Sequence, residues 1–509
     1  MTPRRIAIAA PHTAAIESAE AAVAAGGNAI DAALAAAAAL TVVYPHQCAL
    51  GGDLIALLRR PSGEVTAVIS AGAAPAAIDP ARFAGLDRMP PQGPDTVTVP
   101  GVVAGWQALE RLGASLPLSH GLTRAAELAE SGYAVSPGLD RALQGRRDIL
   151  LADEGMVGVF GDGAGGLKRE GDAVTQPALA ATLRRLAEDP EAMYRGEIAE
   201  SISARLVALG GAMAASDFAE HRAEVIDPVE LEHGGARWWV APPPTQGVVL
   251  LGILPEALSA DDPSDPALVE AARAALLTRT AQLGDPRGGA IDVPAMLDPR
   301  GRSAEGHLPR PGRAMGDTVA VVAADSDGTV VTLIQSVYQW FGSGILDPAT
   351  GVVLHNRGSA FSTDPEHPAH VGPGLRPPHT LLPVIAESED LLVGLGCQGG
   401  SAQPWILAQV ASGVLDPARD PAEVLSRGRW VIGARDLGFE SLTLLAEPGT
   451  DAAADAAEGL GLGTARRDSR FDEAGHVQVA RLHRHTPRLL DAASDPRADG
   501  RAAVFTAQQ

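Results

Sequence analysis

The feature that most restricts the fold of this chain is the change of pattern at Thr318. Residues 285–317 are rich in Gly, Pro and Arg and show little hydrophobic periodicity, which predicts a long exposed loop. Two apolar runs follow, 318–324 and 329–336, and the Asp- and Gly-containing segment 325–328 between them is typical of a β-hairpin turn. The chain is therefore expected to consist of two parts that meet where the loop runs directly into a core strand.

The order of the other elements favours an α+β fold rather than repeated βαβ units. Before the loop, a helix over 13–25 is ended by Gly26-Gly27, and Asn28 begins a second, deeply buried helix. The remaining patterns predict strands over 53–58, 64–70, 238–240, 381–386 and 391–395, and helices over 122–131, 177–188, 198–208 and 402–414. The segment 97–105 is expected to turn into a helix that ends near residue 112. We find no internal repeat and no Rossmann or P-loop glycine pattern.

Composition excludes several classes of function. The chain has 509 residues and a net charge of −22, which argues against nucleic acid and anionic membranes as partners. The apolar stretch 32–43 is shorter than the roughly 20 residues that a membrane span needs. With no signal peptide in the first residues and only two cysteines, Cys48 and Cys397, we expect a cytoplasmic protein with reduced, buried thiols.

Metal and cofactor sites are not expected. The run 483–485 (His-Arg-His) is short and flanked by Arg, which is more typical of a solvated strand end than of a metal site. Asp53, which follows two glycines, is interpreted as a lone acid that opens a strand.

Thr318 is the strongest candidate for a catalytic residue. If the chain were cut in front of it, Thr318 would gain a free α-amine, and a threonine paired with its own amine is a known activated nucleophile. An ordinary α-amine has a pKa of about 7.7–8.0, which suits a general base at neutral pH. The alternative is that Thr318 is an ordinary residue at the start of a strand.

Eight separate segments of the chain form a recognisable set: 26–33 (Gly-Gly-Asn-Ala-Ile-Asp-Ala-Ala), 100–105 (Pro-Gly-Val-Val-Ala-Gly), Thr318 with Asp327-Gly328 downstream, 341–344 (Phe-Gly-Ser-Gly), 351–356 (Gly-Val-Val-Leu-His-Asn), 373–377 (Pro-Gly-Leu-Arg-Pro), 396–400 (Gly-Cys-Gln-Gly-Gly) and 495–500 (Asp-Pro-Arg-Ala-Asp-Gly). In this order they resemble the γ-glutamyltranspeptidase family of N-terminal-nucleophile hydrolases. The resemblance covers residues from about 6 to 505.

This resemblance implies a fold and a maturation step. The fold would be a four-layer αββα sandwich, in which two stacked sheets are flanked by helices. The precursor would cut itself between Asp317 and Thr318, giving a large subunit, 1–317, and a small subunit, 318–509, that share one core. One such pair or a dimer of pairs would form the enzyme, without metal or organic cofactor.

The resemblance also implies roles for individual residues. Thr318 would be the nucleophile, and the backbone N–H groups of Gly399 and Gly400 would stabilise the oxyanion of the tetrahedral intermediate. Ser336 falls where the family has a hydroxyl near the nucleophile, and Asn356 ends a strand motif. The alternatives are a tight turn for the glycines and a structural turn amide for Asn356.

Three departures from the family bear on the substrate. The γ-glutamyl enzymes hold the substrate with an Arg, an Asp and a Ser-Ser pair, whose positions are here Ala71, Ala360 and His379-Thr380. Because charge-assisted hydrogen bonds are worth roughly 1.5–3 kcal/mol each, a free γ-glutamyl group is not the expected substrate.

Three segments differ from the γ-glutamyl enzymes: 335–341 (Gln-Ser-Val-Tyr-Gln-Trp-Phe), 355–358 (His-Asn-Arg-Gly) and 376–380 (Arg-Pro-Pro-His-Thr). They resemble a side branch of the family, the oxamate amidohydrolases. An arginine beside the nucleophile would then bind the carboxylate of a small amide, because the guanidinium forms a bidentate fork. For Arg357 and Arg376 the alternative is a pair with an acidic neighbour, for Tyr338 simple packing, and for His379 a structural role. The substrate-binding candidates are Ser336, Tyr338, Asn356, Arg357, Arg376, His379, Thr380 and Gln398.

The sequence thus predicts a self-processing Thr-dependent amidohydrolase that acts on a small carboxylate-bearing amide through an acyl-enzyme. The alternatives among enzymes are a γ-glutamyl hydrolase or transferase and a glutaryl-type acylase. An uncleaved, non-catalytic binding or scaffold homologue is the alternative of another class, because Val319-Ala320 replaces the family's usual Thr-His after the nucleophile.

Overall fold

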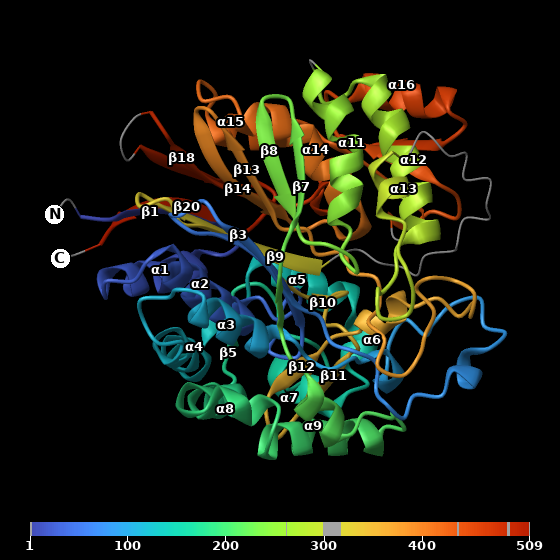
Figure 1. The fold of residues 1–509 in the computed structure, drawn as a ribbon. Helices are drawn as coiled ribbons and strands as arrows, with labels where there is room; N and C mark the ends of the chain where they lie inside the picture. Colours follow the sequence, from blue (N-terminus) through green and yellow to red (C-terminus); the bar gives the residue numbers. More distant parts are fainter. Residues whose placement is uncertain (1–2, 261, 299–316, 435–436, 486–488, 508–509) are drawn as a thin grey trace.

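Two large antiparallel sheets organise the chain. The computed structural model describes residues 3–260, 262–298, 317–434, 437–485 and 489–507 (Figure 1). The first sheet has the strand order β20 (Arg501–Thr506), β1 (Arg5–Ala10), β9 (Asp317–Asp325), β10 (Val330–Tyr338), β2 (Asp53–Arg59), β3 (Val65–Ser70) and β6 (Glu224–Ile226). The second has the order β19 (Leu490–Ser494), β18 (Val477–His483), β14 (Leu391–Cys397), β13 (Val384–Ser388), β8 (Ala236–Val240) and β7 (Val229–His233).

Each sheet combines strands from before and after residue 317. In the first sheet β9 and β10 lie between β1 and β2, and in the second β13 pairs with β8. The two parts of the chain therefore contribute to the same hydrogen-bonded ladders.

Helices cover the outer side of each sheet, as Figure 1 shows. One apolar cluster joins the first sheet to α1 (Thr13–Ala24), α2 (Ala29–Val43), α3 (Val102–Arg111), α4 (Ser119–Ser131), α8 (Pro177–Glu188) and α9 (Glu197–Ala208). Another joins the second sheet to α11 (Gly247–Ser259), α12 (Pro266–Gln282), α14 (Gln403–Val414) and α16 (Asp451–Gly459). The mixed helix-and-sheet class expected from the sequence is confirmed.

A third apolar cluster contains residues of both sheets, including Ala320 and Ile334 of the first and Ile385 and Leu392 of the second. Along β9, alternate residues belong to this cluster and to the helical one, as the pleat of a strand requires. Thr318 has the same parity as Ala320, so its side chain points toward the second sheet.

Local sequence explains the early helices. The Asn28 side chain accepts from the N–H groups of Ile30 and Asp31, and Asp31 accepts from the Asn28 N–H in return, which forms a capping box. Every residue of α2 is buried, as its apolar composition predicts. The expected hairpin between β2 and β3 is also present.

Two expectations need correction or restriction. The segment expected as a loop over 285–317 contains the helix α13 (Val293–Leu297), and residues 299–316 of it lie outside the described residues. The strand expected from 381 begins only at Val384, because the Leu382 N–H donates to the Gln403 side chain instead of to a neighbouring strand.

Cys48 and Cys397 are buried and free, as expected. Within the parts of the chain that the structure describes, no helix is long and apolar enough to cross a membrane.

Candidate active site

Thr318 lies at the start of β9 and is 1% exposed. The pairing of β9 with β10 shifts register between Gln335 and Tyr338, and this bulge leaves Ser336 beside Thr318. Tyr338 has a φ of +77°, a conformation that is strained for a bulky residue. The strand irregularity therefore occurs at the point where the sequence places the nucleophile.

The hydroxyl of Ser336 connects the two residues of the candidate cleavage site. It accepts from Thr318 Oγ1 at 3.2 Å and from the Tyr338 N–H at 2.8 Å, and it donates to the carbonyl oxygen of Asp317. A serine hydroxyl has one donor and two acceptor positions, so all are used. The result is a relay from the Thr318 hydroxyl to the carbonyl group of the preceding residue.

The Asp317 side chain is buried and incompletely hydrogen-bonded. It is 1% exposed, and its Oδ1 has no hydrogen-bond partner. Burial raises the pKa of this carboxyl well above its ordinary value, although the charge of Arg146 acts in the opposite direction. The environment of the Asp317–Thr318 peptide bond therefore favours the protonated form of the Asp317 carboxyl.

We expect Asp317→Asn to stabilise the uncut chain, tested in a Thr318→Ala background that prevents cleavage. Above the ordinary pKa of 3.8, the unfolded chain releases the Asp317 proton while the folded chain keeps it. The Asp form therefore loses about 1.4 kcal/mol of stability per pH unit until the raised pKa is reached, and the neutral amide does not. Melting temperatures at pH 5 and pH 8 check this, and a difference between the two chains that does not grow with pH contradicts it.

Asp53 is not the lone acid that the sequence suggested. The register between β10 and β2 sets Ser336 opposite Asp53, so both lie in one row with Thr318. The buried Asp53 carboxylate accepts from the Gly72 N–H at 3.0 Å, and it lies 3.0 Å from His379 Nε2 and 3.4 Å from His355 Nδ1. Burial alone would raise its pKa, but the facing histidines hold the pKa below its ordinary value.

His379 is thus paired within the protein. Burial lowers the pKa of His379 to about 4, with the Arg357 charge acting in the same direction, so that its ring is neutral at neutral pH. The His379 ring has a structural role, because it is bonded to Asp53. It is also the neighbour of another substrate-binding candidate, Thr380, in the sequence.

Arg357 is buried without an acidic partner. Its Nη1 donates to Thr380 Oγ1 at 3.2 Å, its guanidinium carbon lies 3.9 Å from the centre of the Tyr338 ring, and its Nε has no partner. Among the described residues, Arg357 forms no ion pair with a carboxylate. Burial lowers its pKa to about 10, so the group still carries its charge at neutral pH.

Arg376 has a different environment. It forms ion pairs with Asp285 at 2.8 Å and with Glu224 at 2.9 Å, and its backbone N–H also donates to Asp285. The two arginine candidates therefore differ in one decisive respect, since only Arg357 has a guanidinium that no described carboxylate neutralises.

The Asn356 side chain joins two other segments of the chain. Its Oδ1 accepts from the Gln339 N–H at 3.1 Å, and its Nδ2 donates to the Pro91 carbonyl at 2.7 Å. This bonding agrees with the structural alternative for Asn356.

Gly399 and Gly400 follow the end of β14. This strand crosses β9 closely: an ideal Cβ at Gly394 would lie 2.6 Å from Val322, and one at Gly396 would lie 3.3 Å from the Cβ of Ala320. The contacts advance by two residues on each strand, so the chain after Cys397 continues toward Thr318. Gly400 has a φ of +54°, and Gln398 contributes a buried Oε1 without a partner.

Gln246 is a buried residue that the sequence reasoning missed. Its Nε2 donates to the carbonyl groups of Thr380 at 2.7 Å and of Gly400 at 2.8 Å, and its Oε1 accepts from Arg279 at 2.7 Å. The preceding turn also pairs with the chain at His379 through backbone hydrogen bonds. The sequence did contain an indication of this residue. Gln246 lies between three consecutive prolines and an apolar helix, and a polar side chain that is buried there must be hydrogen-bonded.

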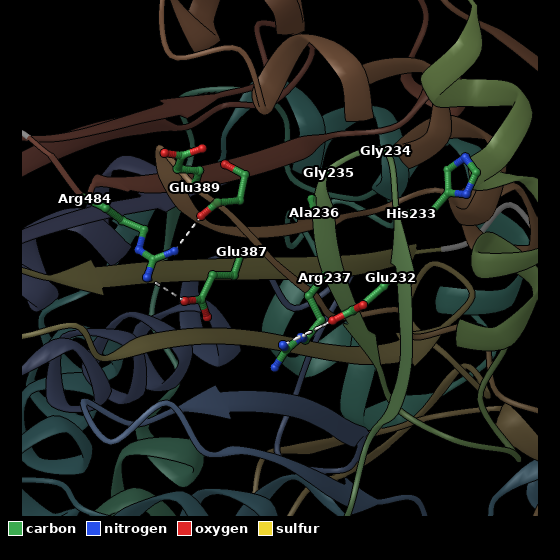
Figure 2. Close-up of a pocket in the computed structure, with 10 residues that line it drawn as sticks. Glu232, His233, Gly234, Gly235, Ala236, Arg237, Glu387, Glu389 and Arg484 are labelled. Carbon is green, nitrogen blue, oxygen red and sulfur yellow. Dashed lines mark hydrogen bonds and ion pairs between the residues drawn. The ribbon is translucent and has the colours of Figure 1, made fainter.

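A surface pocket of about 690 Å³ lies elsewhere (Figure 2). It is lined by the turns of the β7–β8 and β13–β14 hairpins, at the opposite end of β14 from Cys397. Its arginines are paired, Arg484 with Glu387 at 3.2 Å and Arg237 with Glu232 at 3.2 Å. None of the candidate residues lines it. Among the described residues there is also no group of acidic, His and Cys side chains that could hold a metal ion.

Comparison with known proteins places the chain among relatives. The sequence profile of the gamma-glutamyltranspeptidase family matches residues 15–505. The oxamate amidohydrolase proenzyme of Klebsiella pneumoniae subsp. pneumoniae is 38% identical over 97% of this chain and 98% of its own length. The glutathione hydrolase-like YwrD proenzyme of Bacillus subtilis is 31% identical over 97% of each chain.

Solved structures show the same fold. The cephalosporin acylase from Bacillus halodurans aligns with a TM-score of 0.85 and 29% identity, over 99% of this chain and 96% of that one. The gamma-glutamyltranspeptidase of Helicobacter pylori aligns with a TM-score of 0.53 and 28% identity, over 57% of this chain and 87% of that one.

Proposed function

Because the chain belongs to the gamma-glutamyltranspeptidase family, we propose that it is a self-processing amidohydrolase with Thr318 as its nucleophile. Membership of this family identifies the chain as an enzyme. Its relatives are named as amidohydrolases, glutathione hydrolases and acylases. The proposed substrate is a small amide that carries a carboxylate, such as oxamate.

Self-processing begins from the hydrogen bonds of the uncut chain. Thr318 Oγ attacks the carbonyl carbon of Asp317, while its proton passes toward Ser336 and the Ser336 hydroxyl stabilises the developing oxyanion. The C–N bond breaks, the Thr318 nitrogen takes a proton to become an amine, and an ester remains between Asp317 and Thr318. Water then hydrolyses the ester, giving the Asp317 carboxylate and a free Thr318.

The same hydroxyl then acts on the substrate. The Thr318 amine takes the proton from Oγ as the oxygen attacks the amide carbonyl, and the N–H groups of Gly399 and Gly400 stabilise the tetrahedral oxyanion. Ammonia leaves with that proton and the acyl-enzyme forms. Water attacks the ester, with the amine again as base, and the free acid and Thr318 are released.

The observation that carries the substrate class is the environment of Arg357. A buried guanidinium without an acidic partner is costly unless an anion joins it. Arg357 lies against Tyr338, which is bonded to Ser336, and it contacts Thr380. A substrate carboxylate beside the nucleophile would supply the missing charge through a bidentate pair.

The other candidates receive roles around this pair. Tyr338 and Thr380 orient Arg357, Gln398 offers its Oε1 to the substrate's amide, and Asp53 fixes the ring of His379 beside Thr380. Arg376 is bonded to Asp285 and Glu224, and Asn356 is bonded to Gln339 and Pro91. Both residues support the walls of the site.

The proposal includes the four-layer αββα arrangement, cleavage into 1–317 and 318–509, and assembly of the two parts as one pair or a dimer of pairs. The core shared between the sheets and the mixed origin of their strands support it. An acylase for a larger side chain is the second candidate, supported by the fold shared with cephalosporin acylase.

Two measurements test the proposal. Intact mass under denaturing conditions should give two chains, the smaller beginning at Thr318, and a persistent single chain would favour the scaffold alternative. A panel of oxamate, γ-glutamyl anilide and glutaryl amides should then give the highest kcat/KM for oxamate. Faster turnover of a γ-glutamyl or glutaryl compound would overturn the substrate class but not the nucleophile.

A further inference from the structure

Gln246 connects two loops, one at Thr380 and one at Gly400, whose relative position matters for the proposed reaction. Thr380 contacts the carboxylate-binding Arg357, and Gly400 belongs to the pair that would stabilise the oxyanion. Both backbone carbonyls accept from one Gln246 amide group, at 2.7 Å and 2.8 Å. The side chain is completely buried, so these bonds do not compete with water.

The bridge is fixed from its other end. Arg279 donates to Gln246 Oε1 at 2.7 Å, which determines which way the amide faces and directs both N–H groups toward the carbonyls. The Gln246 backbone N–H donates to the His379 carbonyl at 3.0 Å, and the His379 N–H donates to the Pro244 carbonyl at 2.8 Å. The turn before α11 is thus joined to residues 379–380 through main chain and side chain together.

The hydrogen bond from Gln246 restricts a residue, Gly400, whose backbone is otherwise flexible. Its φ of +54° lies in the left-handed region, and glycine loses more backbone entropy on ordering than any other residue. A hydrogen bond to its carbonyl restricts the peptide that follows the proposed oxyanion donors. Catalytic donors act only when held at the correct distance, and a misplacement of about 1 Å can cost 10²-fold in rate.

We propose that Gln246 is a positioning residue that aligns the carboxylate anchor, Thr380 with Arg357, with the oxyanion donors at Gly399 and Gly400. This inference rests on the proposed function, since it assumes the roles given there to Arg357 and to the two glycines. Gln246 itself touches no reacting atom. It sets the separation between the two ends of a small substrate, the carboxylate and the reacting carbonyl.

The test is Gln246→Met, which keeps the volume and removes the donors. Gln409→Met is its matched control, because Gln409 is also buried, donates to the carbonyls of Trp405 and Trp430, and accepts from the Trp430 N–H, but joins α14 to β15 (Trp430–Gly433) in the outer part of the fold. Rates are normalised to the fraction of chain cleaved at Thr318. Oxamate is compared with acetamide, which has no carboxylate to align.

We expect Gln246→Met to lower kcat for oxamate about 10–100-fold, and Gln409→Met to change it less than about 3-fold at a similar loss of melting temperature. Acetamide hydrolysis should fall by a smaller factor than oxamate hydrolysis in Gln246→Met. If that variant does not fold, Gln246→Glu keeps the Arg279 contact and presents acceptors to both carbonyls, with the same expected order.

Equal losses for both amides, or a kcat within 3-fold of wild type, overturn the positioning role. Failure of the proposed function is seen separately, in the wild-type chain. If that chain is cleaved but prefers a longer amide, the proposed substrate is wrong, and the same variants are compared with that amide and its analogue without the carboxylate.

Discussion

Thr318→Ala will remain a single chain of 52.1 kDa and will show no amidase activity. The methyl group cannot attack the Asp317 carbonyl, so the relay through Ser336 has no nucleophile to deprotonate. Loss of a nucleophile typically lowers kcat by about 10⁴–10⁶, which is the largest effect expected in this protein. Intact mass and hydrolysis of oxamate measure the two consequences independently.

Thr332→Ala is the matched control for that experiment. Thr332 is also a buried threonine of the first sheet, and its Oγ1 donates to the Val384 carbonyl at 3.0 Å. Its loss should affect stability while cleavage and turnover continue. Cleavage of Thr318→Ala between residues 317 and 318, or activity in it above background, would exclude Thr318 as the nucleophile.

Much of the fold could be predicted because its elements are locally consistent. The helix expected over 177–188 coincides with α8, and Asn28 caps α2 with the partner that the sequence offers, Asp31. The strand boundary was wrong where a backbone N–H donates to a side chain instead of to a neighbouring strand. The Leu382 N–H donates to the Gln403 side chain, and the strand expected from residue 381 begins three residues later, at Val384. Hydrophobic periodicity does not signal such a contact.

The site was less predictable because its contacts are long-range. Resemblance to a family could indicate Thr318, Ser336 and the two glycines, since these lie in motifs. Asp53 and Gln246 could not be found this way, because Asp53 meets His379 across 326 residues and Gln246 meets Gly400 across 154. The sequence gives no reason to prefer Arg357 or Arg376 as the carboxylate-binding residue. The structure distinguishes them, because Asp285 and Glu224 form ion pairs with Arg376.

Arg357→Lys should lower kcat/KM for oxamate about 10²–10⁴-fold. Lysine retains the positive charge but replaces the planar fork with a single ammonium, and it cannot reproduce the stacking on Tyr338. Two charge-assisted hydrogen bonds at roughly 1.5–3 kcal/mol each account for this range. Steady-state kinetics with oxamate and acetamide check it, and the loss should be confined largely to oxamate.

Arg376→Lys is the matched control for Arg357→Lys. It shows whether replacing any buried arginine of this region by lysine lowers activity, or only replacing the one proposed to bind the carboxylate. A lysine there can still neutralise Asp285 and Glu224, so we expect kcat/KM to change less than about 3-fold. If Arg357→Lys and Arg376→Lys lose activity equally, the absence of an acidic partner at Arg357 does not identify the anion site, and the carboxylate must bind elsewhere. If only Arg357→Lys loses oxamate turnover and both amides react at similar rates in it, the unpaired charge is what selects a carboxylate-bearing amide.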